Sequence, residues 1–198
     1  MDCMLHETLA PLAEAVHSRI RDTLSPGRYE HSLRVARLSG DLCNRFSLDH
    51  ASGYLAGLAH DLCKELPKEA LMALAARDGR EIGTIETKKP ALLHGRAAAM
   101  VLVHEYGMEE GEITGAVRHH TFGDPALDPL SLVVYVADKL EPGRDQFPEE
   151  FRELVFRMEL YPMTLAVLDH SIDYLESRGK LVSDESRRMR DALAKEVS

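Results

Sequence analysis

Six ionisable residues stand among apolar residues, at positions where their side chains should face the protein interior. They are His31, His60, Asp61, His94, His120 and Asp138. His60 and Asp61 are neighbours within the apolar stretch LAGLAHDLCKEL, residues 55–66. An ionised carboxylate in an apolar setting is costly unless a group of opposite charge meets it. The rest of the chain must therefore supply a positive partner for Asp61.

Helical spacing places the other four residues on the apolar stripes of their own segments. His31, for example, shares its stripe with Val35 and Leu38. A single histidine of this kind is usually a core residue with satisfied hydrogen bonds or a helix cap. Two carboxylates and four imidazoles are hard to satisfy by hydrogen bonds alone, but they are the ligands that a divalent first-row metal takes. Six ligands are too many for one catalytic ion with an open position, and they suit two ions bridged by a carboxylate.

The neighbours His119 and His120 are distinguished by the same spacing. On a helix that begins near Glu110, His120 falls on the apolar stripe of Ala116 and Val117, whereas His119 falls on a polar face. We therefore expect only His120 to face the core.

The elements that carry these residues are predicted to be helices almost throughout. A first apolar stripe runs from Leu5 to Ile20, and later helices are expected near 28–46, 50–64, 67–77, 94–106, 110–120, 129–140, 148–158, 162–178 and 183–196. No convincing alternating strand appears. Segments 78–92 and 121–128 are the best candidates for irregular loops.

Composition narrows the class of protein. The chain has 198 residues, of which 44% are hydrophobic, so it is long enough for one compact domain. The net charge of -9 argues against general nucleic-acid binding. The cysteines Cys3, Cys43 and Cys63 form no CxxC pair and predict neither a disulfide framework nor a thiolate zinc site. With neither a membrane span nor a signal peptide in the sequence, we expect a soluble cytoplasmic protein without a membrane partner.

The order of the ionisable residues resembles the H…HD…D signature of the HD-domain metal-dependent phosphohydrolases. Six blocks narrow the resemblance: RYEHSLRVA at 28–36, HDLCK at 60–64, LLHG at 92–95, RHHT at 118–121, ADKLEPGR at 137–144 and ESRGKL at 176–181. In this order they are similar to the blocks of the YqeK-type symmetrical bis(5'-nucleosyl)-tetraphosphatases. The resemblance covers residues 28–190, and it departs at Phe122, where a second small polar residue is expected.

The resemblance implies an all-α fold, an HD-domain helical bundle with additional C-terminal helices. We expect a single domain over 1–198, with an N-terminal helix in 1–24, a metal-site core in 28–144 and C-terminal helices in 145–198. It also implies two divalent metal ions, described as di-iron, with manganese, cobalt, nickel and zinc as alternatives. The implied reaction is cleavage of diadenosine tetraphosphate into two ADP.

The resemblance also assigns roles to residues. His31, His60, Asp61 and Asp138 would hold one ion and His94 and His120 the second, with Asp61 bridging. Lys64, one helical turn beyond Asp61, suits a phosphoryl group, Arg144 could reach back over the site, and Thr121 follows His120 directly. Taken alone, a solvated Lys64 and a surface ion pair for Arg144 are equally good interpretations. With the resemblance, we expect Asp61, Lys64 and Arg144 to be catalytic, and Lys64, Thr121 and Arg144 to bind substrate.

Two other functions stay open at this level. The same site could act on another nucleotide, such as a nucleoside monophosphate or a deoxynucleoside triphosphate. Alternatively, a non-catalytic regulator could use the fold to bind a nucleotide, although such a protein has no need of six buried ligands. In each case the expected partner is a small-molecule nucleotide rather than a nucleic acid.

Overall fold

The protein is helical throughout the residues that its computed structural model describes, which are 2–126, 128–144 and 146–198, with only the backbone described for 2–8. The helices are α1 (Asp2–Thr23), α2 (Pro26–Arg45), α3 (His50–Ala59), α4 (Lys68–Ala75), α5 (Thr84–Lys88), α6 (His94–His104), α7 (Glu112–His119), α8 (Pro129–Leu140), α9 (Glu149–Val155), α10 (Leu160–Ser177) and α11 (Asp184–Val197). Two short 3₁₀ helices, η1 (Ala76–Asp78) and η2 (Pro90–Leu93), join them. Within these ranges there is no strand, which confirms the predicted all-α fold.

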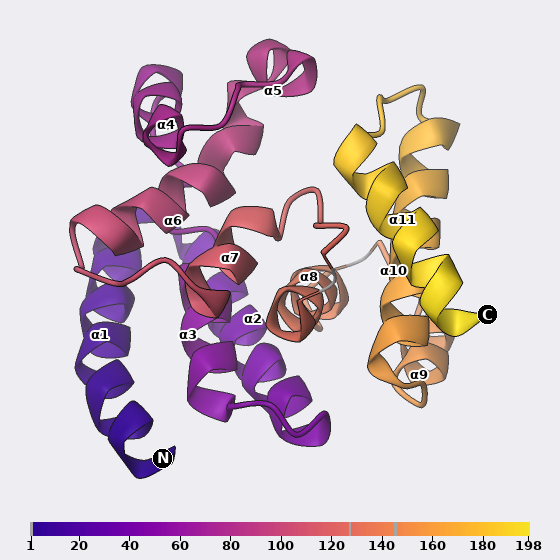
Figure 1. Ribbon diagram of the computed structural model, residues 1–198, viewed down its shortest axis with the longest axis horizontal. Helices are drawn as coiled ribbons and strands as arrows, with labels where there is room; N and C mark the ends of the chain where they lie inside the picture. Colours follow the sequence, from indigo (N-terminus) through magenta and orange to yellow (C-terminus); the bar gives the residue numbers. More distant parts are fainter. Residues whose placement is uncertain (1, 127, 145) are drawn as a thin grey trace.

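Helix α8 is the centre of the molecule (Figure 1). It packs against α2, α3 and α7 on one side and against α10 on the other, so that the C-terminal helices form a layer beyond it. Ten of its twelve residues are buried. A helix that is apolar on all sides is stable only when it is enclosed, and this explains why the run from Leu132 to Ala137 lies in the core.

Glycines on α3 allow α2 and α3 to approach closely. A Cβ added to Gly57 would lie 2.9 Å from the carbonyl oxygen of Val35 and 2.7 Å from Ser39 Oγ. Only a residue without a side chain fits at such a distance. The close crossing brings His31, on α2, next to the residues that follow α3.

The prediction of one helix over 50–64 is wrong at its C-terminal end. Helix α3 ends at Ala59, and the chain then tightens into successive turns. Their bonds join residues three apart, for example Leu62 N to Ala59 O at 3.0 Å and Lys64 N to Asp61 O at 2.9 Å. His60 and Asp61 therefore stand at the end of a helix and not in its middle.

The prediction of an irregular loop over 78–92 is also wrong, because this segment contains α5 and η2. The guanidinium of Arg96, on α6, holds the segment by bonding Asp78 at 2.8 Å and Glu86 at 2.9 Å. Such a long-range anchor cannot be read from local spacing. The segment 121–128, by contrast, contains no helix among its described residues.

The cysteines with described side chains are buried free thiols. Burial raises the pKa of Cys43 and of Cys63 to about 12. Both thiols are therefore poor nucleophiles and poor metal ligands. The side chain of Cys3 lies outside the described residues.

None of the helices in the described part of the chain is both long enough and apolar enough to cross a membrane.

Candidate metal centre

Four histidine side chains converge where α2, α6, α8 and the ends of α3 and α7 meet. His60, His94 and His120 each direct Nδ1 at the carbonyl oxygen three residues earlier, at 2.7 Å in all three cases. His31 directs Nδ1 at Glu141 Oε1 at 3.0 Å. Because carbonyl oxygens and ionised carboxylate oxygens only accept, Nδ1 carries a proton in all four rings. Nε2 is left as a free lone pair, which is the atom that a metal ion would take.

The Nε2 atoms meet in two pairs. The first histidine pair is His31 and His60, with Nε2 atoms 3.2 Å apart, and the second histidine pair is His94 and His120, with Nε2 atoms 2.9 Å apart. Two unprotonated nitrogens at this distance repel each other unless a cation binds both. Adjacent ligands of one ion, each about 2.1 Å from it and at right angles, would be about 3.0 Å apart. The spacing of both pairs therefore fits metal ligation.

Asp61 lies between the two histidine pairs and turns one oxygen toward each. Its Oδ1 lies 3.0 and 3.7 Å from the Nε2 atoms of the second pair, and its Oδ2 lies 3.7 and 4.0 Å from those of the first pair. Oδ1 is buried and accepts no hydrogen bond from any described residue, although the Lys64 ammonium is 3.1 Å away as an ion-pair partner. A buried carboxylate oxygen that accepts no hydrogen bond fits the role of a metal ligand, because a bound cation would satisfy it.

Asp138 belongs to the side of the first histidine pair. Its Oδ1 lies 3.2 Å from Nε2 of His31 and 3.7 Å from Nε2 of His60. Two groups of donor atoms are compact enough for one ion each, with all donors within 4.8 Å of one another. They are His31, His60 and Asp138 in one group, and His60, Asp61 and His120 in the other. The chemistry and the spacing of the donors both fit divalent first-row metals.

The charges at the centre keep both aspartates ionised. Burial alone would raise the pKa of Asp61, but His60, His94 and Lys64 outweigh it and hold the pKa well below its usual range. Burial likewise opposes ionisation of Asp138, yet the charges around it hold its pKa well below the usual range too. Burial lowers the pKa of His60 and of His120, so both imidazoles are neutral near neutral pH. The centre thus presents two anionic carboxylates and, at His60 and His120, two neutral imidazoles, which are the protonation states that metal binding requires.

The predicted substrate-binding residues lie at the rim of this centre. Lys64 Nζ is 2.9 Å from Nε2 of His94, and Thr121 Oγ1 is 3.3 Å from Nε2 of His120. Arg144 donates from Nη2 to Asp138 Oδ1 at 2.6 Å. The structure therefore brings together all the residues that the sequence singled out, with the basic groups on the more exposed side.

Three further residues at the centre were not predicted. Arg28 places Nη1 3.7 Å from Asp61 Oδ2, and Lys139 donates to the carbonyl oxygen of His120 at 3.1 Å. Glu141 is buried between His31 and the Arg34 guanidinium. A signal for two of them was present, because Arg28 precedes His31 by three residues and Glu141 follows Asp138 by three, and residues at this spacing share a helix face.

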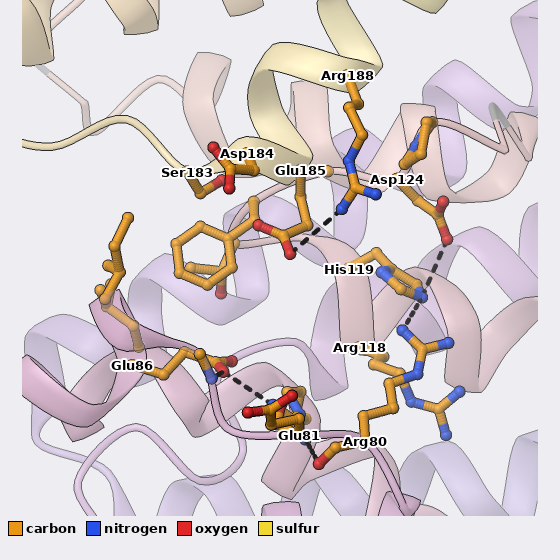
Figure 2. Close-up of a pocket in the computed structure, with 18 of the residues that line it drawn as sticks. Arg80, Glu81, Glu86, Arg118, His119, Asp124, Ser183, Asp184, Glu185 and Arg188 are labelled. Carbon is orange, nitrogen blue, oxygen red and sulfur yellow. Dashed lines mark hydrogen bonds and ion pairs between the residues drawn. The ribbon is translucent and has the colours of Figure 1, made fainter.

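Two cavities open among the described residues beside the second histidine pair, and Thr121 and Phe122 line both. The larger cavity has a volume of about 450 Å³ and the smaller cavity about 350 Å³. Figure 2 shows that His119 lies at the larger cavity, where its Nε2 is 3.4 Å from Arg80 Nη1 and 3.1 Å from Asp124 Oδ2. His120 is only 2% exposed and faces the centre. The two neighbours thus face different surroundings, as their spacing predicted.

Comparison with known proteins gives a consistent picture. The HD domain family matches residues 28–143. The chain is 33% identical, over 68% of its length and 73% of the relative, to a symmetrical bis(5'-nucleosyl)-tetraphosphatase of Bacillus subtilis. It is 34% identical, over 63% of its length, to a probable nicotinate-nucleotide adenylyltransferase/Ap4A hydrolase of Mycoplasma pneumoniae, of which it spans 35%.

A solved structure shares most of this architecture. It is the crystal structure of a predicted HD superfamily hydrolase involved in NAD metabolism from Clostridium acetobutylicum. The TM-score is 0.84 at 26% sequence identity, and the alignment covers 92% of this chain and 97% of the other. The likeness therefore extends beyond residues 28–143 to the C-terminal helices.

Proposed function

Since this chain belongs to the HD-domain family, we propose that it hydrolyses dinucleoside tetraphosphates symmetrically, with diadenosine tetraphosphate giving two ADP. The observation that carries the proposal is the position of Asp61, which turns one oxygen toward each histidine pair. The names of the relatives supply the substrate class. A cytoplasmic location is part of the same proposal.

Two divalent ions are part of the proposed centre. In this proposal His31, His60, Asp61 and Asp138 would hold one ion, and His94 and His120 would hold the other, with Asp61 shared between the two. Iron is the proposed metal, and manganese, cobalt, nickel and zinc have the same preference for nitrogen and oxygen donors. Such a pair supplies Lewis acidity to the phosphoryl oxygens and lowers the pKa of water.

The basic residues at the rim would bind the phosphates. The Lys64 ammonium and the Arg144 guanidinium both face the carboxylates of the centre, so both are within reach of a phosphoryl group bound there. Arg144 offers a planar fork of donors and Lys64 a compact charge. Thr121 adds a hydroxyl beside the second histidine pair. The departing nucleoside diphosphate is a stable anion, so strong general-acid help is not required.

Product analysis tests the reaction. The metal-loaded protein is incubated with diadenosine tetraphosphate, nucleoside monophosphates and deoxynucleoside triphosphates, and the products are separated by chromatography. We expect ADP as the sole product from the dinucleotide. Equal amounts of AMP and ATP would reject symmetrical cleavage, and turnover of the mononucleotides alone would favour the alternative substrates.

The bridging position of Asp61 is tested by metal analysis. Asp61→Ala should lose most of the bound metal and the activity together, because one carboxylate serves both ions. Asp173→Ala is a suitable control, since Asp173 is an exposed residue of α10. If Asp61→Ala keeps two ions per chain, the bridge is assigned to the wrong residue.

A further inference from the structure

The smaller cavity lies between the metal centre and the C-terminal layer. Its walls come from α5, η2, the residues after α7, α8, α10 and the segment that leads into α11. The apolar residues that line it include Ile85, Leu92, Phe122, Ile172, Leu175 and Leu181. Part of this wall comes from α10 and the segment before α11, which lie outside residues 28–143, the part that the HD domain family matches. Ligand binding in this cavity would therefore depend partly on residues that the HD domain family does not match.

Two residues connect the smaller cavity to the metal centre. Lys139 lines the cavity, and its Nζ lies 3.3 Å from Asp138 Oδ2 and 3.1 Å from the carbonyl oxygen of His120. Thr121 also lines the cavity, and its hydroxyl faces the second histidine pair. A molecule with its phosphates at the centre could therefore extend into the cavity without crossing another element.

The apolar wall of the smaller cavity is left partly open to water. Leu181 is 64% exposed, and Ile85, Leu92, Phe122 and Leu175 are partly exposed. Apolar side chains from separate segments that converge on one cavity are typical of a ligand site, because covering them removes apolar surface from water.

Basic residues surround this apolar wall. Lys88, Lys89 and Lys180 line the same cavity and are exposed, and Lys139 lies at its inner end. The chain as a whole has a net charge of -9, so this local positive charge is opposite to the overall charge. It would attract a ligand that combines an apolar part with an anionic part.

The larger cavity differs in character, because charged side chains make up much of its lining and several of them already have partners. Figure 2 shows His119 beside Asp124, at 3.1 Å, and Glu185 beside Arg188, at 3.6 Å. An uncharged aromatic group gains less among paired charges than against an apolar wall. The smaller cavity is the better site for such a group.

We propose that the smaller cavity binds one nucleobase of the substrate, with Phe122 and Leu181 as its principal contacts. The inference rests on the proposed function, which supplies a ligand with polyphosphate at the metal centre and a base at its end. Phe122 offers an aromatic ring, and bases of every kind stack on aromatic rings. Phe122 thereby acquires a role that a small polar residue at this position could not fill.

The hydroxyl groups of the cavity indicate how the base is selected. Ser171 Oγ donates to Val167 O at 2.8 Å, and Ser186 Oγ donates to Phe122 O at 2.8 Å. Ser183 Oγ lies 3.0 Å from Ser186 Oγ. These three hydroxyls donate their protons within the protein, so they offer the base no donor, and stacking and apolar contact supply most of its binding. A pocket of this kind discriminates weakly, and adenine and guanine dinucleotides should differ by less than about tenfold in kcat/KM.

Binding of ADP and of pyrophosphate to the metal-loaded full chain separates base contacts from phosphate contacts. Phe122→Ala should raise the Kd of ADP about tenfold, as expected for the loss of one stacked base. Leu181→Ala should raise it a few-fold. Neither substitution should change the Kd of pyrophosphate. The matched control is Leu154→Ala, because Leu154 is also an exposed leucine, 56% exposed, and does not line the cavity.

The outcomes are distinct. Phe122 lines both cavities, whereas Leu181 lines only the smaller one. The proposal is therefore overturned if ADP binds Leu181→Ala as tightly as it binds the control, or if pyrophosphate binding weakens in parallel with ADP binding. Leu181→Ala keeps the test valid if Phe122→Ala fails to fold, since an exposed leucine contributes little to stability. A preference of more than about a hundredfold between diadenosine and diguanosine tetraphosphate would reject base selection by stacking alone.

Wild-type turnover is measured on the same samples. If the wild type does not cleave diadenosine tetraphosphate, the proposed function fails, whereas the comparison of ADP with pyrophosphate still decides whether a base binds in the smaller cavity. If the wild type cleaves it but Phe122→Ala and Leu181→Ala bind ADP normally, only the cavity assignment fails.

Discussion

At the scale of single residues, the neighbours His119 and His120 provide the sharpest test of the metal centre. His120→Ala should lose one ion and reduce turnover by more than about a hundredfold, because its Nε2 pairs with that of His94. His119→Ala should keep both ions, because its ring lies against Arg80 and Asp124. Metal content and steady-state rates measure the difference. If His119→Ala loses an ion and His120→Ala keeps both, the assignment of His120 as the ligand is wrong.

Glu141 is expected to act through His31. Its carboxylate accepts the Nδ1 proton of His31 at 3.0 Å and also pairs with Arg34. Glu141→Gln keeps the shape and an acceptor but loses the charge, so we expect metal affinity to fall about 10–100-fold. Competition with a chelator measures the affinity, and Glu150→Gln, an exposed residue of α9, is the control. Unchanged affinity in Glu141→Gln would remove Glu141 from the centre.

The pH dependence of metal binding should follow His31. Burial alone would lower the pKa of His31, but Asp138 and Glu141 outweigh burial and raise it above its ordinary value of 6.5 in the metal-free protein. A metal ion binds only the unprotonated imidazole, so a proton on His31 competes with it. Metal affinity should therefore rise with pH through the raised pKa of His31 and level off above it. Chelator competition between about pH 5 and 8 measures this, and constant affinity over that range would contradict histidine ligation.

At the scale of helices, the contact between α6 and α7 sets the position of His120. A Cβ on Gly95 would lie 2.9 Å from both Val117 O and His120 Cε1. Gly95→Ala should push the His120 ring aside, weaken binding of one ion and reduce the free energy of unfolding by about 1–3 kcal/mol. Urea unfolding and metal analysis measure the two effects.

The control for this prediction is another helical glycine. Gly115 lies within α7, and apart from its chain neighbours and the backbone of its own helix no described heavy atom lies within 4 Å of a Cβ built there. Gly115→Ala should therefore stabilise the protein by about 0.5–1 kcal/mol through helix propensity and leave metal content unchanged. If Gly95→Ala behaves like Gly115→Ala, the close contact does not control the site.

At the scale of the whole molecule, the proposed ions join segments that are distant in sequence. Their ligands come from α2, the turn after α3, the start of α6, the end of α7 and α8. Each ion at a hundred times its Kd should stabilise the fold by about 2.7 kcal/mol, and for a chain of this length each kcal/mol corresponds to about 2–4 °C in Tm. A chelator should thus lower the Tm of the wild type by about 5–10 °C for each ion that it removes. Asp61→Ala should show no such shift, and a wild-type Tm that is insensitive to chelator would contradict the prediction.

The sequence by itself determined the fold class, the family and the inward direction of the six ionisable residues. Helical periodicity shows whether a side chain lies on the apolar face of its own helix, and the positions of the other helices are not needed to determine this. It separated His120 from His119 correctly. It failed at the end of α3, where i→i+3 turns replace the helix after Ala59, and in 78–92, which depends on the distant guanidinium of Arg96.

Only the tertiary structure decided which histidines meet and what surrounds them. The pairing of His31 with His60 depends on how closely α2 and α3 cross, and Gly57 allows that close crossing because it has no Cβ. The contact of Glu141 with His31 joins residues 110 positions apart. The smaller cavity forms where α10 and the segment before α11 pack beside Phe122. Local sequence fixes the direction of a side chain about its own helix axis, whereas the distance between helices follows from the packing of every contacting side chain at once.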